Sequence, residues 1–274
     1  MSIRTASKSF LALGSLALAV LLCPVPVRAT EITFLSSGTN PVSGQSISAT
    51  VKFQVVGGAL QVTLTNTGAD VLRPTDVLTA VFFDITGDPA LSSVSAVLAG
   101  TSTVAFGSPD PGGVVGGEWA YKRGLSGAPN GAKQGISSSG FGLFGAATFP
   151  GSNLQGPSAV GGLQYGITSG VDILSTGNTP VTGTNALIKN SVLFTLGSLP
   201  SGFSLADISN VGFQYGTSLT DPYLAAAPVQ AEGMHAAPEP ATMFLFGSGL
   251  TGLGLFQRRR RPRRSPCAVP GRRA

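Results

Sequence analysis

The chain offers few residues that could do chemistry. Its one histidine is His235, and its two cysteines, Cys23 and Cys267, lie far from the central part of the sequence. Ser-His-Asp triads, Cys-His pairs and histidine-based zinc sites all need residue types that the central part lacks. No P-loop is present, and no GxGxxG follows a strand and opens a helix. The sequence therefore argues against most common enzyme classes, and we expect no catalytic residues.

Four carboxylates remain as chemical candidates: Asp84, Asp88, Asp110 and Glu118. Such groups could act as the acid and base of a glycosidase or as oxygen ligands of Ca²⁺. However, Asp88 and Asp110 each precede a proline, a pattern typical of turns. EF-hand loops and glycine-aspartate calcium repeats are absent. We therefore expect no cofactor and no metal, with Ca²⁺ binding and a β-sandwich polysaccharide hydrolase as the alternatives.

The best candidate for ligand binding is the segment Glu118-Trp119-Ala120-Tyr121-Lys122. In a strand, Trp119 and Tyr121 lie on the same face, where flat rings could stack on a sugar. Aromatic rings at this spacing more often pack into a core or hold down loops, and we favour that interpretation. The alternative function is a carbohydrate-binding module centred on Glu118, Trp119 and Tyr121, which requires an exposed indole.

The elements that would position these residues are strands. The clearest signal runs from Ile47 to Thr65, with Gly57-Gly58 supplying the positive φ angles of a two-residue hairpin loop. This loop fixes a register in which Val55 faces Leu60, Phe53 faces Val62 and Val51 faces Leu64. Gln54 then meets Gln61, and Lys52 meets Thr63, on the opposite face. Pattern and turn chemistry agree, since a slip of one residue would turn the apolar side chains outward.

Further strand patterns follow along the chain, with no sustained helical periodicity. Residues 76–86 are apolar on both faces, which is typical of a central strand. Residues 91–98, 101–106, 186–196 and 211–215 are also strand candidates, and residues 204–207 suggest one helical turn. The middle, 107–170, is rich in glycine but also in aromatic residues, so we expect ordered loops. These patterns predict an antiparallel, jelly-roll-like β-sandwich with long glycine-rich loops.

The N-terminus has the pattern of a signal peptide. Arg4 and Lys8 precede an apolar run over residues 10–22, and Val27-Arg28-Ala29 provides a small residue for cleavage. We therefore predict a signal helix in residues 1–29, removed between Ala29 and Thr30. Cys23 follows the bulky Leu22, which argues against lipoprotein processing.

Charge is divided unevenly along the chain. The whole chain is +5, but residues 30–237 hold eleven acidic and six basic side chains, a net charge of −5. The excess of positive charge therefore lies in the two terminal segments, and nucleic-acid binding by a basic face is excluded. Residues 30–237 also contain no cysteine, so this part has no disulfide and must depend on a packed core.

The C-terminal segment has three parts in a fixed order: Pro238-Glu239-Pro240, the uncharged span Ala241–Phe256, and the cluster Arg258-Arg259-Arg260-Arg261. As a helix the 16-residue span is about 24 Å long, slightly shorter than the ~30 Å hydrocarbon core. The arginines place the C-terminus in the cytoplasm by the positive-inside rule. We predict a β-sandwich at 30–222, a flexible stalk at 223–240, a transmembrane helix at 241–257 and a cytoplasmic tail at 258–274.

These three parts resemble the PEP-CTERM sorting signal of Gram-negative bacteria. The resemblance implies cutting near Pro238-Glu239-Pro240 by the membrane protease exosortase, and release toward the cell surface. The segments 82–89, 116–122, 137–145, 190–196 and 213–217 are together similar to an exosortase-dependent surface-protein family. That resemblance implies surface location and no particular chemistry.

We therefore expect an exported protein that is held briefly in the inner membrane and then sorted to the surface. Signal peptidase and exosortase are its expected partners during processing, and exopolysaccharide is a candidate partner afterwards. The predicted function is structural or adhesive, at the cell surface or in the biofilm matrix, without enzymatic activity.

Overall fold

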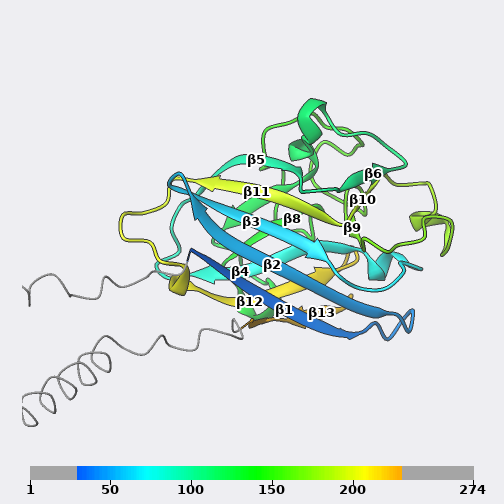
Figure 1. The fold of residues 1–274 in the computed structure, drawn as a ribbon, viewed down its shortest axis with the longest axis horizontal. Coiled ribbons are helices and arrows are strands. Elements are labelled where there is room, and N and C mark those ends of the chain that lie inside the picture. The colour runs from blue at the N-terminus through cyan, green and yellow to red at the C-terminus, as the bar shows by residue number, and fades with distance from the viewer. Residues whose placement is uncertain (1–29, 230–274) are drawn as a thin grey trace, which may run out of the picture. The chain divides into compact units, whose positions relative to one another are not determined.

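The computed structural model describes residues 30–229, which form two packed β-sheets (Figure 1). Sheet A has the strand order β14-β1-β2-β3-β11-β5, and sheet B has the order β13-β12-β4-β9-β10-β6, with β8 joining β4 and β7 joining β8. The pair β9–β10 is parallel, whereas the other strand pairs are antiparallel.

The strands are β1 (Glu31–Thr39), β2 (Ser46–Val56), β3 (Ala59–Asn66), β4 (Leu78–Ile85), β5 (Ser92–Leu98), β6 (Thr103–Ala105), β7 (Ala120–Arg123), β8 (Gln134–Ser137), β9 (Ile167–Thr168), β10 (Leu187–Lys189), β11 (Ser191–Gly197), β12 (Ile208–Tyr215), β13 (Tyr223–Ala225) and β14 (Ala227–Pro228). Short 3₁₀ turns are η2 (Pro74–Asp76), η3 (Pro111–Gly113), η4 (Gly116–Glu118), η5 (Pro129–Gly131), η6 (Thr179–Val181) and η7 (Leu205–Asp207).

The β2–β3 hairpin has the predicted register. Val51 pairs with Leu64, Phe53 with Val62, and Lys52 with Thr63. Gly57 and Gly58 have φ angles of 58° and 78°, the left-handed conformation that this two-residue loop requires. The apolar members of these pairs are buried against sheet B, except at the hairpin tip, where Val55 is exposed. The turn and the alternating pattern therefore specify the same register, as expected.

Strand β4 is covered on both faces, as its sequence predicts. Phe83 packs edge-on against Phe53 of sheet A, with ring centroids 5.4 Å apart. Phe82 points to the other side, where it packs against Phe141 and Phe144 of the glycine-rich segment. Two adjacent phenylalanines thus belong to two different cores, one between the sheets and one outside sheet B.

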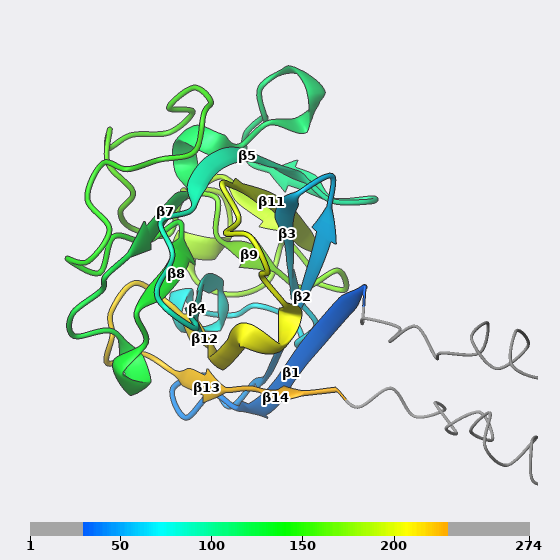
Figure 2. The same cartoon turned by 90° about the vertical axis from the view of Figure 1, so that its left-hand side faces the viewer.

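The glycine-rich middle of the chain is folded against β7 and β8, on the side away from β1, β2 and β3 (Figure 2). Its aromatic residues hold it in place, since Phe144, Phe149 and Tyr165 are buried. Gly116 and Gly117 allow a very close approach of the backbone of residues 150–152. A Cβ atom at either position would lie 1.9 Å from a carbonyl oxygen of that segment. Glycine is required here for contact between two chain segments.

Two expectations about strand boundaries are wrong. The predicted strand 186–196 is two strands, since the chain leaves sheet B after β10 and enters sheet A with β11. Asn190 lies at the break, with a φ of 92°. The predicted stalk begins too early at residue 223. Strand β13 pairs with β12, and β14 pairs with β1, so the folded part extends to Val229.

The all-β, two-sheet class is confirmed, whereas the jelly-roll subtype is not established by this strand order. Within residues 30–229, no helix has the length and apolar character needed to cross a membrane. The predicted signal helix, the transmembrane helix, the Pro238-Glu239-Pro240 motif and the arginine tail lie outside the described residues, as does Ala29 of the predicted cleavage site.

Candidate functional site

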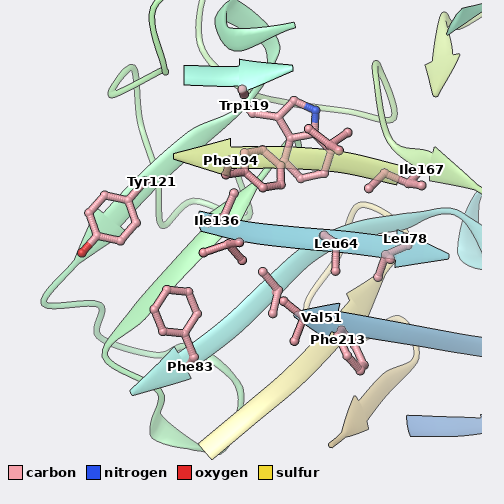
Figure 3. Packing of buried hydrophobic residues seen from close by; sticks show 14 of the residues in the cluster. Val51, Leu64, Leu78, Phe83, Trp119, Tyr121, Ile136, Ile167, Phe194 and Phe213 are labelled. Carbon is pink, nitrogen blue, oxygen red and sulfur yellow. The ribbon is translucent and has the colours of Figure 1, made fainter. Parts of the chain in front are cut away.

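Trp119 lies in the core between the sheets. It immediately precedes β7, and its ring packs on Phe194 of β11 with a centroid separation of 5.0 Å (Figure 3). Phe149 contacts the same Phe194 ring at 5.4 Å. The indole is fully buried, and its Nε1–H has no hydrogen-bond acceptor among the described residues. The side chain therefore presents no surface to a ligand.

Tyr121 is also buried, and its hydroxyl group is used internally. It donates a hydrogen bond to Oε1 of Gln134 at 2.9 Å, and Nε2 of Gln134 donates to Asp88 at 2.9 Å. Arg123 completes this chain by donating to the main-chain oxygen of Asp88 at 2.8 Å. Burial, together with the nearby charge of Asp88, raises the pKa of Tyr121 above its usual value. The phenol therefore stays protonated and holds the β4–β5 turn against β7 and β8.

The hypothesis of a sugar-stacking platform at Trp119 and Tyr121 is therefore wrong. Both rings belong to the core between the sheets, as the preferred interpretation of their spacing predicted. The physical reason is the large apolar area of the two rings, which is more stable away from water. Stacking on a sugar would require an exposed ring face at this position.

Glu118, the third candidate ligand-binding residue, anchors a loop. One carboxylate oxygen, Oε1, accepts hydrogen bonds from the main-chain N–H groups of Leu154 at 2.6 Å and Gln155 at 2.8 Å. Burial raises the pKa of Glu118, although these two hydrogen bonds partly oppose the shift. Glu118 thus holds the 150–155 loop beside Gly116 and Gly117.

The other acidic candidates fall into two separate groups. Asp110 accepts from the main-chain N–H of Ser152 and therefore holds the same loop as Glu118. Asp84 and Asp88 form the second group, beside β8. There Asp84 accepts a hydrogen bond from the main-chain N–H of Lys133 at 2.7 Å. The four predicted acids thus lie at two separate places, with Asp84 in strand β4.

The described residues contain no group of three or more His, Cys, Asp or Glu side chains able to hold a metal ion. Of the four candidate carboxylates, Asp84, Asp110 and Glu118 accept from main-chain N–H groups, and Asp88 accepts from the side chain of Gln134. Their arrangement fits the anchoring of loops to the sheets, which a domain without disulfides needs at its long connections.

A pair of carboxyl groups that the sequence analysis did not select lies at the other end of the sandwich. Asp172 accepts from the main-chain N–H of Val71, and Asp70 accepts from that of Ile173. Burial and the neighbouring Asp70 raise the pKa of Asp172. Burial acts in the same direction on Asp70, but hydrogen bonds from Thr176 and Ile173 outweigh it and lower the pKa of that group. No sequence signal identifies the pair, because 101 residues separate Val71 from Asp172.

Comparison with known proteins gives one match. Residues 236–261 match the family model of the PEP-CTERM protein-sorting motif. The match confirms the resemblance seen in the sequence and implies that this is an exported protein targeted to exosortase for sorting to the cell surface. No match was found among curated proteins or among solved structures.

Proposed function

We propose that the folded domain is a non-enzymatic structural or adhesive component of the cell surface or of the exopolysaccharide matrix. The observation that carries the proposal is the sorting motif at 236–261. Only six residues, 230–235, separate that motif from Val229, the last described residue of the sandwich. The β-sandwich is thus the part of the chain that the motif delivers.

The arrangement of polar groups supports a structural role. Glu118, Asp110 and Asp84 each accept hydrogen bonds from main-chain N–H groups 36 to 49 residues away. Each of these three acids therefore fixes a loop through at least one carboxylate oxygen, which supports a structural use of the group.

In the proposed route, signal peptidase cuts between Ala29 and Thr30, and residues 241–257 then hold the protein transiently in the inner membrane. The four arginines at 258–261 stop transfer on the cytoplasmic side. Exosortase cuts near Pro238-Glu239-Pro240 and releases the domain toward the surface.

Mass spectrometry of the protein recovered from the cell surface tests this route. We expect Thr30 at the start and an end near Glu239. Recovery of a surface form that still carries the arginine tail would contradict exosortase processing.

A strain that lacks the chain tests the proposed role. We expect weaker cell attachment or weaker retention of the matrix, restored by the wild-type chain. Restoration should also occur with Glu118→Gln, which keeps the accepting oxygen but removes the carboxylate. Normal attachment and normal matrix in the deletion strain would refute the structural role. Loss of rescue with Glu118→Gln, in a protein that is still folded and exported, would favour an enzyme.

A further inference from the structure

The last described segment of the chain, residues 223–229, closes one edge of both sheets. Strand β13 pairs with β12 of sheet B, and β14 pairs with β1 of sheet A (Figure 2). The chain passes from one sheet to the other at Ala226, whose N–H donates to the main-chain oxygen of Val211 at 2.8 Å. We call residues 223–229 the closing segment, and the edges of β1 and β12 to which it binds the acceptor edge.

Two glycines in the acceptor edge make room for two side chains of the closing segment. A Cβ atom at Gly38 of β1 would lie 2.9 Å from Cδ2 of Leu224. A Cβ atom at Gly212 of β12 would lie 1.9 Å from the hydroxyl oxygen of Tyr223. Neither glycine has a positive φ angle, so the backbone does not require glycine at these positions. The missing side chains instead fit the acceptor edge to the sequence of the closing segment.

Apart from these two side chains, the closing segment is bound largely through its backbone. The N–H of Val229 donates to the oxygen of Thr33 at 2.7 Å. The hydroxyl of Ser36 donates to the oxygen of Ala225 at 2.8 Å. The segment lies at the edge of each sheet, so it can separate without breaking any other strand pair. Its departure would leave unpaired N–H and C=O groups on β1, to which another chain can pair.

The connection between β12 and β13, residues 216–222, decides whether the segment closes on its own chain. The chain reverses at Gly216, whose φ is 70°, a conformation that favours glycine. Nε2 of Gln214 donates to the main-chain oxygens of Asp221 and Pro222 at 3.0 and 3.3 Å, which holds the connection against β12. An extended connection would carry the closing segment away from its own acceptor edge.

We propose that the acceptor edge binds the closing segment of a second copy, so that copies of the protein join by exchanging residues 223–229. This inference rests on the structural form of the proposed function. The occupant is already seen in the structure, because an exchanged segment keeps the register and the contacts of the closed form. Only the 216–222 connection changes, so the balance between closure and exchange depends on how closely the copies are held together.

The place of the closing segment in the chain favours exchange between neighbouring copies. Six residues, 230–235, separate it from the sorting motif at 236–261. Six residues span at most ~22 Å. In the proposed route, copies held in one membrane therefore present their closing segments close to the same plane. This confinement raises the effective concentration of one copy's segment at the acceptor edge of the next.

Cysteine pairing tests which chain supplies the segment. Leu35 and Ala227 face each other across β1 and β14. The Cα atoms of such facing residues are about 4.5–5.5 Å apart, within the range of a disulfide. One tagged chain carries Leu35→Cys, and a co-expressed chain with a different tag carries Ala227→Cys, with Cys23 and Cys267 replaced by serine in both. We expect a disulfide-linked heterodimer on the cell surface that is several-fold more abundant than either homodimer.

The matched control places Lys52→Cys in one tagged chain and Thr63→Cys in the other. These residues face each other in the β2–β3 hairpin, which is not exchanged, so we expect no excess of heterodimer. Adding Gly216→Val to both chains of the Leu35 and Ala227 pair should raise the ratio of heterodimer to monomer roughly tenfold. The reason is that valine is strained at this φ, and its Cβ would lie 2.3 Å from a carboxylate oxygen of Asp221.

Equal amounts of heterodimer from the two pairs, or none from either, would overturn the proposal. An unchanged ratio with Gly216→Val, in a protein recovered in normal amount, would also overturn it. The attachment assay separates this result from the proposed function. A single chain with both Leu35→Cys and Ala227→Cys can be locked closed as a monomer. If the deletion strain attaches poorly and this locked monomer restores attachment, the structural role stands and exchange is not part of it.

Discussion

Glu118 binds two consecutive main-chain N–H groups with a single oxygen atom. Glu118→Ala should leave the N–H groups of Leu154 and Gln155 without an acceptor and lower the free energy of unfolding by about 1–3 kcal/mol. Glu118→Gln should lose much less, because Oε1 of glutamine accepts both bonds. Urea unfolding of the three proteins measures the difference. Equal stability of the alanine variant and the wild type would show that the 150–155 loop is held by other contacts.

The pH dependence of the same variants has a definite sign. Burial raises the pKa of Glu118 in the folded protein. The folded state therefore binds the proton more tightly than the unfolded state does, and the stability present at low pH is lost as the pH rises through the raised pKa. Glu118→Gln should remove this contribution. The free energy of unfolding of the Glu118→Gln variant should therefore increase relative to that of the wild type as the pH rises above the ordinary pKa range of a glutamate.

Trp119 is the only tryptophan of the chain and is fully buried. Its fluorescence should therefore be poorly quenched by iodide in the folded protein and strongly quenched after unfolding. Trp119→Ala should lower the free energy of unfolding by about 3–5 kcal/mol through the cavity that it leaves. Trp119→Phe should lose less, because it also removes an N–H that has no acceptor among the described residues. Strong quenching of the folded protein would contradict the burial.

At the scale of the elements, the 169–178 loop depends on the facing carboxyl groups of Asp70 and Asp172. Because the pKa of Asp172 is raised, its contribution to stability is lost as the pH rises through that value. Asp172→Asn should therefore be more stable than the wild type at pH 7, and the advantage should disappear in acid. Asp70→Asn is the matched control. Because the pKa of Asp70 is lowered, this variant should be less stable than the wild type at pH 7.

Thermal unfolding between pH 3 and pH 8 measures both effects. Hydrogen exchange at Ile173, whose N–H donates to Asp70, reports whether the loop opens by itself. A destabilised Asp172→Asn variant at neutral pH would mean that the charge of Asp172 is favourable in the folded protein.

Strands β13 and β14 are the element that links the two sheets at one edge. Tyr223 and Leu224 pack against the two cores, and Ala227 and Pro228 pair with β1. A mature chain that ends at Pro222 should therefore have a free energy of unfolding about 3 kcal/mol or more below that of a chain that ends at Val229. Equal denaturation midpoints for the two lengths would restore the predicted stalk boundary at 223.

Local patterns allowed the sequence to predict the strands with strong turn chemistry. Gly57-Gly58 and the alternation around it determine the β2–β3 register, and adjacent Phe82 and Phe83 indicate a strand covered on both faces. The break at Asn190, between β10 and β11, could not be predicted in this way. Both strands next to it are apolar, and the change of sheet depends on partners as distant as Leu64 and Ile167. Short end strands such as β14 have too few residues for a periodic signal.

The sequence identified the residues of the candidate site but not their contacts in the folded protein. The sequence named Glu118, Trp119 and Tyr121, and it favoured packing over ligand binding for the aromatic pair. The partners of Glu118 are main-chain groups of Leu154 and Gln155, which have no side-chain signature. The facing pair Asp70 and Asp172 was missed because its contacts join segments about 100 residues apart.

For the whole molecule, the main property is stability without covalent cross-links. Residues 30–237 contain no cysteine, so we expect the melting temperature of the processed protein to be the same with and without a thiol reductant. The long loops are fixed by carboxylates such as Asp110 and Glu118 and by buried aromatic rings. A clear drop in melting temperature with reductant would contradict the proposed processing, because a disulfide requires a chain that still holds Cys23 or Cys267.

The pairing of β14 with β1 also bears on the order of events during export. Phe34 and Leu35 pair with Pro228 and Ala227, so the first strand of the domain finds one of its neighbours near the last residues of the domain. In a chain that crosses a membrane from its N-terminus, β1 emerges early. Its partner β14 emerges only after nearly all of the domain. Sheet A can therefore be completed only when translocation has nearly ended. Contacts this far apart in sequence form slowly, so retention of the C-terminal segment in the membrane would give the domain time to close before release.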